Sequence, residues 1–576
     1  MSDQTRGVIF VVVVIAITFI WMKFFQPPAP PPQKTGPVAG NTAPAQNAGA
    51  GSAQPSAGSA ATQSSATPAV APHISVAQAT AEKNIVVESS LYRVELSNHG
   101  AVVRSWKLKN YFDDQKTPQP LDLVNPDAAQ ELGWPLSLML SDQQLETQAN
   151  TALYEVTPGS ESLTAPAEIT FHWSDGHLDV TKKLKFTQDY QMSLEVSASL
   201  DGRPLSPAVA WRGGFGDKAV YQAPQLVTVF YKLGDNLNLL QYKKLGVSGN
   251  QIQPLEQSGP LQFTGIMDQF FAAAFIPDGS DLALWHWTQW HHYTGSDNQP
   301  AADPAAEIAV GAASAGPLKA RVYVGPKDLA LLGKVQPSLE GLINFGWLGV
   351  ISKALLLTLQ WLHHYIPNWG WAIVVLTLVI NTAVFPLKMK SWRSMQEMQK
   401  IAPEMKQIQD KYKKYSMTDP RKKGMQEEML ALQQRHGISP FASLGGCLPM
   451  LLQMPIWWAL WRVLTGAIEL RHAAWFLWIH DLSVKDPFYI LPAAMAITMY
   501  ISMAMTPQSA AIDPAQQKMM RLMPLTFVVI FFRYASGLNL YMFTSNIIGV
   551  AQQYYLNRTR PLPSNSPFKN KKKKQQ

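Results

Sequence analysis

Five long apolar segments in the last third of the chain restrict its possible folds more than any other feature of the sequence. They lie at about residues 367–387, 441–465, 488–505, 522–536 and 538–556. A helix needs roughly 20 apolar residues to cross a bilayer, and these segments are near that length, although the last two are short or interrupted. The pattern predicts an α-helical transmembrane bundle.

Another apolar run, residues 8–22, lies near the N-terminus between Arg6 and Lys23. Its length of about 15 residues fits either the core of a signal peptide or a short membrane anchor. Bulky residues follow it where a signal peptide would have small residues for cleavage. We therefore predict an uncleaved transmembrane anchor over residues 1–25, which makes six spans in all.

The charged residues are divided unevenly along the chain. Residues 81–340 contain 19 Lys or Arg and 29 Asp or Glu, so the totals of 48 and 40 leave 29 basic and 11 acidic residues elsewhere. Lys and Arg collect in short cytoplasmic loops, whereas a large translocated domain can be acidic. The loop at 388–435, with 12 basic and 6 acidic residues, is therefore predicted to be cytoplasmic. It belongs to a helical hairpin over 388–440, with helices at about 391–415 and 420–436.

Alternating apolar and polar residues predict strands throughout residues 81–336. Turn sequences such as Asp175-Gly176 separate them, and the segment contains no cysteine. This pattern is typical of a large antiparallel β-sandwich. The preceding residues 26–80 are rich in Pro, Ala, Gly and Ser, carry little charge, and predict a disordered tether. The clearest predicted strands are 85–88, 92–96, 102–108, 169–173, 178–186 and 192–197.

A cluster of Trp and His at residues 285–292 stands out within the predicted β domain. Such side chains can stack on a sugar or bind a metal. However, no carboxylate pair lies beside them in the sequence at ligand spacing. We therefore interpret them as aromatic strand packing with exposed histidines, and predict no site there.

Residues 337–366 join the predicted β domain to the bundle. They are apolar on one side but interrupted by Gly, Lys, Gln and His, and they include Trp347 and Trp361. We predict an interfacial amphipathic helix at the outer membrane surface. A further full span is the alternative, but it would invert the topology downstream and place the basic hairpin and the basic tail at 561–576 outside the cell. The charge distribution favours the interfacial helix.

Uncharged polar side chains recur at helical spacing within the apolar segments. Thr377, Asn381 and Lys388 are offset by 4 and 11 residues, which places them within about 40° of one another on a helix. Unpaired amides and hydroxyls are costly in hydrocarbon, so such stripes should face each other or water. Helix-to-helix hydrogen bonding explains any single residue, but four coincident stripes favour a hydrated groove. The other stripes contain Gln453 beside Met450, Thr498 with Ser502, and Asn539, Asn546 and Gln553.

The polar stripes also restrict the class of function. They contain no nucleophile with its base, no carboxylate pair and no metal-ligand cluster, so we expect no enzyme activity, no cofactor and no metal. An ion- or solute-coupled transporter is an alternative, but the apolar cores of the five C-terminal segments contain no Asp or Glu. A membrane-tethered carbohydrate-binding protein is a third interpretation, and it leaves the bundle unexplained.

Several short motifs follow one another after residue 340. They are Asn368-Trp369-Gly370, Phe385-Pro386-Leu387, Leu444-Gly445-Gly446-Cys447-Leu448-Pro449, Gln453-Met454-Pro455, Leu477-Trp478-Ile479-His480-Asp481-Leu482-Ser483, Asp486-Pro487 and Ser536-Gly537-Leu538. In order and spacing, over about residues 340–560, these motifs resemble those of the YidC membrane-protein insertase family. The anchor, tether and β domain resemble the Gram-negative branch of that family.

The resemblance implies an insertase and chaperone that accepts nascent inner-membrane proteins in a hydrophilic groove and releases their helices into lipid, alone or with the Sec translocon. It implies a bacterial inner-membrane location, a periplasmic β-supersandwich domain, an insertase core at 367–560 and cytoplasmic termini. The expected partners are nascent membrane proteins, the Sec translocon, the ribosome and anionic lipids, with no small-molecule substrate. The expected groove residues are Thr377, Asn381, Lys388, Met450, Gln453, Met454, Thr498, Ser502 and Asn546.

The sequence departs from the family at one position that bears on the groove. The family usually has a positively charged residue, most often Arg, where this chain has Asn381. Lys388 lies two turns toward the cytoplasm on the same helix face, and we expect it to supply the missing charge. In the basic tail, Lys571, Lys572, Lys573 and Lys574 are expected to contact lipid or ribosomal RNA, because both present phosphate.

Overall fold

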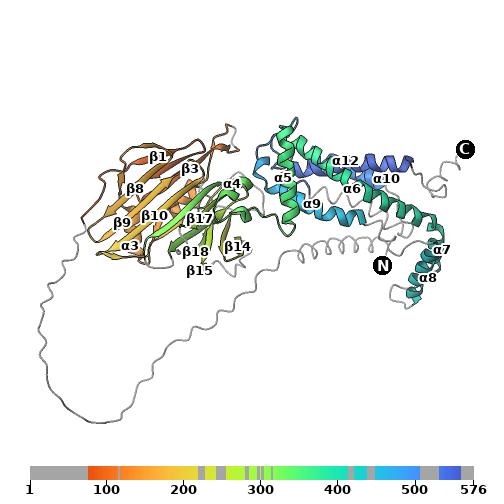
Figure 1. Cartoon of the computed structure of the whole chain (residues 1–576), viewed down its shortest axis with the longest axis horizontal. Helices are drawn as coiled ribbons and strands as arrows, with labels where there is room; N and C mark the ends of the chain where they lie inside the picture. The colour runs from red at the N-terminus through yellow and green to blue at the C-terminus, as the bar shows by residue number, and fades with distance from the viewer. Residues whose placement is uncertain are drawn as a thin grey trace, which may run out of the picture. The chain divides into compact units, whose positions relative to one another are not determined.

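Figure 1 shows a computed structural model of the whole chain. It describes residues 75–559, except 115–116, 218–226, 242–254, 279–283, 295–298, 300–303, 313–315, 413–414, 416–420, 437–447 and 506–530. The described residues all belong to one compact unit, formed by residues 71–511 and 521–576. The predicted anchor, the tether up to residue 74, most of the span at 522–536 and the basic tail lie outside the described residues.

Residues 84–326 form a β domain. Its strands that the structure describes are β1 (Asn84–Glu88), β2 (Tyr92–Ser97), β3 (Val102–Phe112), β4 (Pro120–Asp122), β5 (Ser137–Met139), β6 (Glu155–Thr157), β7 (Ser162–Thr164), β8 (Ala167–Ser174), β9 (Leu178–Phe186), β10 (Gln191–Leu200), β11 (Arg203–Pro204), β12 (Ala208–Trp211), β13 (Thr228–Leu233), β14 (Asn236–Gln241), β15 (Leu255–Ser258), β16 (Leu261–Met267), β17 (Phe271–Pro277), β18 (Leu284–His291), β19 (Ala305–Ala312) and β20 (Leu318–Pro326).

The strands assemble into three sheets. The largest has the order β14-β13-β16-β17-β20-β10-β9-β8-β6, with β11 beside β10, and the two smaller sheets have the orders β4-β3-β2-β1-β7 and β15-β18-β19-β12-β5. Described strand pairs are antiparallel except β1 with β7. The six strands predicted from the sequence are confirmed as β1, β2, β3, β8, β9 and β10. Period-2 burial along β9, where Leu178, Val180 and Leu184 are buried, explains why alternation identified them.

Short helices accompany the β domain, and longer ones follow it. The described helices are α2 (Pro126–Leu132), α3 (Gln143–Thr151), α4 (Leu329–Lys334), the 3₁₀ helix η2 (Glu340–Leu342), α5 (Gly349–Tyr365), α6 (Trp369–Lys400), α7 (Ala402–Tyr412), α8 (Arg421–Arg435), α9 (Leu448–Gly466), the 3₁₀ helix η4 (Ile468–Leu470), α10 (Ile490–Met505) and α12 (Ser536–Thr559).

Within the described residues, one helix is long and apolar enough to cross a bilayer. It is the 30-residue stretch Trp369–Met398 of α6, whose most apolar 18-residue window has a mean hydropathy of 2.0, and α10 is a shorter apolar helix. Four of the five predicted C-terminal segments thus have helical counterparts in α6, α9, α10 and α12. The six-span bundle remains a prediction, because neither the N-terminal anchor nor residues 506–530 are described.

The basic hairpin differs from its prediction at its first helix. We expected a helix to begin near residue 391, but α6 runs without a break from the apolar segment to Lys400. Only then does the chain turn at Ile401 into α7, and α7 packs on α8 through Ile401, Met405 and Leu432. A polar helical face therefore continues the apolar helix, and the change in hydropathy near residue 388 does not end it.

The linker helix α5 is amphipathic, as its sequence predicts. Leu356, Leu359 and Leu362 are buried, whereas Val350 and Trp361 are exposed by 87% and 59%. Such a large apolar face left uncovered is suited to a membrane interface. The location of α5 at the outer membrane surface stays a prediction.

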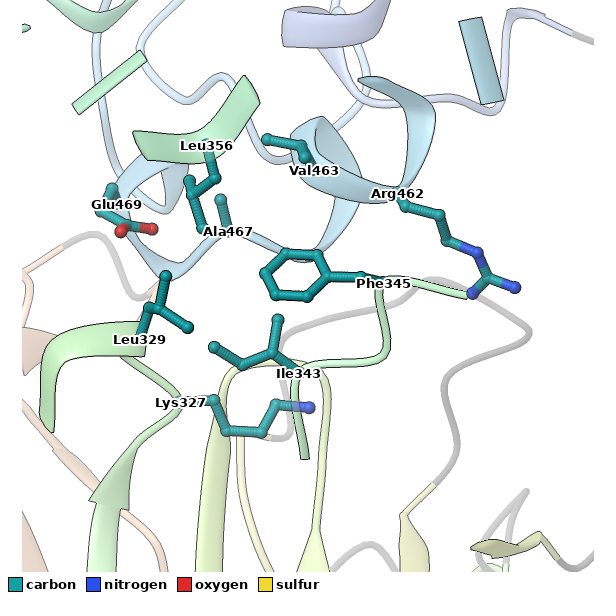
Figure 2. A pocket seen from close by; sticks show the side chains of 10 residues that line it. Lys327, Leu329, Ile343, Phe345, Leu356, Arg462, Val463, Ala467 and Glu469 are labelled. Carbon is teal, nitrogen blue, oxygen red and sulfur yellow. The ribbon is translucent and has the colours of Figure 1, made fainter. Parts of the chain in front are cut away.

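The segment after α9 contacts the β domain. Arg471 donates from Nη2 to Asp217 Oδ2 at 2.5 Å and to the Phe112 carbonyl at 2.6 Å. The side chains of Arg471 and Asp217 are only 3% and 1% exposed, and they therefore form a buried ion pair. A separate small pocket is lined by residues that follow the β domain, by the linker and by α9 (Figure 2).

Candidate functional site: a polar network between α6 and α12

A polar network joins α6 to α12 and includes the lysine singled out by the sequence. Lys388 Nζ donates to Asn381 Oδ1 at 2.9 Å and to Gln552 Oε1 at 3.2 Å. Asn381 Nδ2 in turn donates to Ser545 Oγ at 3.2 Å, and Gln552 Nε2 donates to the Asn381 carbonyl at 3.2 Å. Lys388 thus extends along α6 toward Asn381, as the spacing of the two residues predicted.

The network is buried at its inner end. Thr377 and Asn381 are 0% and 1% exposed. Each also bonds to the backbone of its own helix, Thr377 Oγ1 to the Ile373 carbonyl and Asn381 Nδ2 to the Thr377 carbonyl. These local bonds satisfy hydroxyl and amide groups that would otherwise be unpaired among apolar side chains. The ammonium is therefore held by two neutral amide oxygens.

Helix α9 reaches the same face of α12 through a separate bond. Gln453 Nε2 donates to Tyr541 Oη at 2.9 Å, and Tyr541 is buried. Tyr541 lies one turn before Ser545 on α12, so α9 and α6 bond to the same side of this helix. The predicted convergence of Asn381 and Gln453 is thus indirect, since the two residues meet different side chains of α12.

Two other predicted groove residues, Thr498 and Asn546, make no side-chain hydrogen bond to this network in the part of the chain that the structure describes. Thr498 bonds to the backbone of α10 through the Ala494 and Met495 carbonyls. Asn546 has a buried Nδ2 without a hydrogen-bond partner among the described atoms. Met454 and Ser502 are half-buried, and the Met450 side chain lies outside what the structure describes.

The stripe that α12 turns toward α6 is displaced by one residue from the predicted one. We predicted Asn539, Asn546 and Gln553, but Ser545 and Gln552 bond to α6. Gln553 Nε2 instead contacts the Met505 carbonyl of α10 at 3.5 Å, and Asn539 bonds to the carbonyls of Phe531 and Tyr534. Both sets repeat every seven residues. Sequence spacing gave the period, and only packing could identify which of the two adjacent stripes faces α6.

The Trp and His cluster on β18 corrects the sequence interpretation. His286 is fully buried rather than exposed: it stacks on Tyr231 and its Nδ1 lies 2.8 Å from Thr264 Oγ1. His291 Nε2 lies 2.7 Å from Glu307 Oε2, so a carboxylate does stand beside the cluster. It comes from the neighbouring strand β19, which the sequence spacing around residue 291 could not reveal.

Among the described residues, one group brings three potential metal ligands together. Ligand atoms of Asp114, His472 and Asp481 all lie within 4.8 Å of one another. His472 Nε2 is 2.5 Å from Asp114 Oδ1 and 3.9 Å from Asp481 Oδ2. These distances are those of a histidine that pairs with two carboxylates, so the group is explained without a metal.

The described residues join a large β domain to apolar helices that hold the half-buried Lys388, and the family models that match this chain are those of an inner-membrane protein and of a periplasmic domain. Residues 361–563 match the family described as 60Kd inner membrane protein, and residues 84–358 match the YidC periplasmic domain. The chain belongs to the YidC family.

Its relatives resemble it along most of their length. A membrane protein insertase YidC of Wolinella succinogenes is 33% identical over 501 residues, which cover 84% of each chain. Another, of Syntrophus aciditrophicus, is 31% identical over 570 residues, 96% of this chain and 99% of the relative. Among solved structures, an active YidC insertase with its first transmembrane domain resolved has a TM-score of 0.34 at 18% identity, with 83% of this chain and 95% of that chain covered.

Proposed function

We propose that this protein is a membrane-protein insertase and that the polar network between α6 and α12 receives the hydrophilic part of a nascent chain. Membership of a family whose relatives are named membrane protein insertases supports the activity. The position of Lys388 carries the proposal for the site, because its ammonium bonds to the side-chain oxygens of Asn381 and Gln552. No carboxylate of the described residues lies within 4.0 Å of it.

An ammonium without a carboxylate partner is suited to attract an acidic passenger. Two charges 4 Å apart attract by about 4 kcal/mol at an effective dielectric constant of 20, compared with about 1 kcal/mol in water. A carboxylate in the substrate's polar tail would therefore gain more from Lys388 near the network than from an exposed lysine. Energy for the overall step would come from burial of the substrate's own apolar helix in lipid, without a nucleotide.

Lys388 replaces, in this proposal, the positive charge that relatives usually place at the position of Asn381. Because the two side chains are in contact at 2.9 Å, the charge lies within one hydrogen bond of that position. The amides of Asn381 and Gln552 keep Lys388 extended along α6, toward the membrane interior. Gln453, Met454, Thr498, Ser502 and Asn546 would line other parts of the same groove, with Met450 completing it.

The test compares insertion of two substrates that differ only in the charge of their translocated tails. Lys388→Ala should reduce insertion of the acidic-tailed substrate and have less effect on a tail in which each Asp or Glu is replaced by Asn or Gln. Lys388→Arg should restore it, and Arg533→Ala, which removes an exposed arginine, serves as the matched control. Equal loss for both substrates, or a larger loss with Arg533→Ala, would contradict the role of Lys388.

The topology and the partners belong to the same proposal. Six spans with both termini in the cytoplasm, the interfacial helix α5 and a cytoplasmic hairpin of α7 and α8 agree with the charge distribution. Cooperation with the Sec translocon is proposed from the family resemblance. Contact of the tail at Lys571, Lys572, Lys573 and Lys574 with the ribosome or anionic lipid is proposed from its charge alone.

A further inference from the structure

Arg462 on α9 is a cation without an anionic partner among the residues that the structure describes. Its guanidinium carbon lies 5.1 Å from the Trp461 ring centre and 5.8 Å from the Trp458 ring centre. No carboxylate of the described residues lies within 4.0 Å of it, and its Nε is buried without a hydrogen-bond partner among them. A half-buried arginine whose only described interactions are with aromatic faces lacks the counter-charge that its burial requires.

A second unpaired donor lies beside the first. Trp458 Nε1 is also buried without a partner in the described part of the chain. A Cβ atom built on Gly346 would be 3.6 Å from Arg462 Nε and 3.8 Å from Trp458 Nε1, so both donors lie close to the same point of the backbone. Two N–H donors near one point call for a ligand that offers several acceptor oxygens.

Glu469, the acidic residue of the adjacent pocket, does not neutralise Arg462. Figure 2 shows Glu469 on the opposite side of the pocket from Arg462, and the Arg462 side chain extends outward beside the backbone of Phe345. Glu469 Oε1 accepts a hydrogen bond from Gln360 Nε2 at 2.5 Å instead. Lys327, the other cation of the pocket, donates to the Asp268 carbonyl at 2.8 Å.

The surroundings of Arg462 are those of a membrane surface. Gly346 directly precedes Trp347, whose side chain is 70% exposed, and the uncovered apolar face of α5 begins at Val350. Exposed Trp beside an amphipathic helix is typical of the level of lipid headgroups. Arg462 lies one turn before the end of α9 at Gly466, and its Nε is close to Gly346 at the start of this exposed segment.

We propose that Arg462 and Trp458 form a binding site for the phosphate group of a phospholipid headgroup. A phosphodiester offers two unesterified oxygens, which match the fork geometry of a guanidinium, and the indole N–H adds a third donor. The flanking Trp461 and Trp458 rings fix the guanidinium plane and exclude water from one side of it. A lipid held here would be seated beside the start of α5.

The experiment counts bound phospholipids by native mass spectrometry of the full chain, delipidated in detergent and titrated with phosphatidylglycerol or phosphatidylcholine. Arg462→Gln should raise the concentration needed for the first bound lipid at least about tenfold, since hydrogen bonds to charged groups contribute about 1.5–3 kcal/mol. Trp458→Phe should raise it less, and Arg533→Gln should leave it unchanged. Equal lipid binding by the wild type and Arg462→Gln, or an equal loss with Arg533→Gln, would overturn the proposal.

Two further arms make the result interpretable. Inorganic phosphate at high concentration should displace the first lipid from the wild type in a dose-dependent way and have no such effect on Arg462→Gln; tighter binding of inorganic phosphate than of phospholipid by the delipidated wild type would overturn the assignment to a headgroup. Thermal unfolding in the same detergent checks that Arg462→Gln is folded. If Arg462→Gln is not folded, Arg462→Lys replaces it, since lysine keeps the charge but lacks the two-pronged guanidinium. Arg462→Lys should show an intermediate loss of lipid binding. Full lipid binding by both single variants, Arg462→Lys and Trp458→Phe, would count against the site.

Discussion

Low pH should reduce the stability of the β domain through His286, because this buried imidazole is accommodated only in its neutral form. Thr264 Oγ1 donates to the Phe230 carbonyl at 2.9 Å, so it accepts from His286 Nδ1–H. His286 Nε2 is buried and has no partner among the described residues. Protonation would place an N–H without an acceptor, and a charge, in this apolar site. Burial accordingly lowers the pKa of His286 to about 4.

The sign and size of the effect follow from that shift. The ordinary pKa of histidine is 6.5, so between pH 6.5 and 4 the unfolded chain binds more protons than the folded chain, and stability falls as the pH is lowered. The difference of about 2.5 pKa units corresponds to about 3 kcal/mol once the pH is below 4, and to about 2 kcal/mol at pH 5. Above pH 7 the residue contributes no pH dependence.

The assay is urea unfolding of a fragment spanning residues 75–345, which contains almost the whole hydrophobic core of the β domain. The free energy of unfolding is measured at pH 7.5 and at pH 5 for the wild type and for His286→Phe. Carboxylates titrate in both proteins, so the difference between the two pH dependences isolates His286. The wild type should lose about 2 kcal/mol more than His286→Phe. Parallel pH dependences would refute the neutral, buried imidazole.

Two further predictions concern stability. Lys182→Met should destabilise the β domain by about 3 kcal/mol or more in the same urea assay. The buried ammonium donates to the carbonyls of Gly100, Ala101 and Leu136, and methionine leaves all three unpaired. A loss below about 1 kcal/mol would mean that water replaces the lysine as the donor to these carbonyls. Gly370→Ala should lower the thermal unfolding temperature of the full chain in detergent, since the new Cβ atom would lie 2.1 Å from Trp475 Cδ1. Gly549→Ala is the control: its Cβ atom would have no neighbour within 4 Å, so this substitution should leave the unfolding temperature unchanged or raise it. Equal effects of the two substitutions would contradict the close packing of Gly370 on Trp475.

Local patterns predicted the elements of the β domain better than its contacts. The alternation of apolar residues identified strands such as β9, because each strand has one buried face. It could not predict that Glu307 lies beside His291, since the two residues are on different strands and their register is set by the whole sheet. The exposed His286 expected from its polar side chain is likewise wrong, because Tyr231 and Thr264 on other strands cover it.

In the helices, spacing placed Lys388 and Asn381 on one face of one helix, two turns apart, and the long lysine side chain reaches back along that face to Asn381. The partner stripe on α12 was predicted one residue away from its true position, a rotation of about 100°. That rotation is fixed by packing of α12 on α6, α9 and α10 together, with Tyr541 bonded to Gln453 and Gln553 to the Met505 carbonyl. Periodicity in one helix contains no information on these neighbours.

The one-residue displacement also explains how the network can keep a lysine inside. If Asn546 and Gln553 faced α6, as predicted, their amides would occupy the positions that Ser545 and Gln552 take. In the structure Gln552 is placed to donate to the Asn381 carbonyl while it accepts from Lys388, so a single amide satisfies a backbone acceptor of α6 and the ammonium at once. Ser545 completes the arrangement by accepting from Asn381 Nδ2, which leaves Asn381 Oδ1 for Lys388. The two amide oxygens that accept from the lysine, those of Asn381 and Gln552, are thus turned toward it by bonds made on the amide nitrogens, and no carboxylate of the described residues lies close enough to cancel the charge.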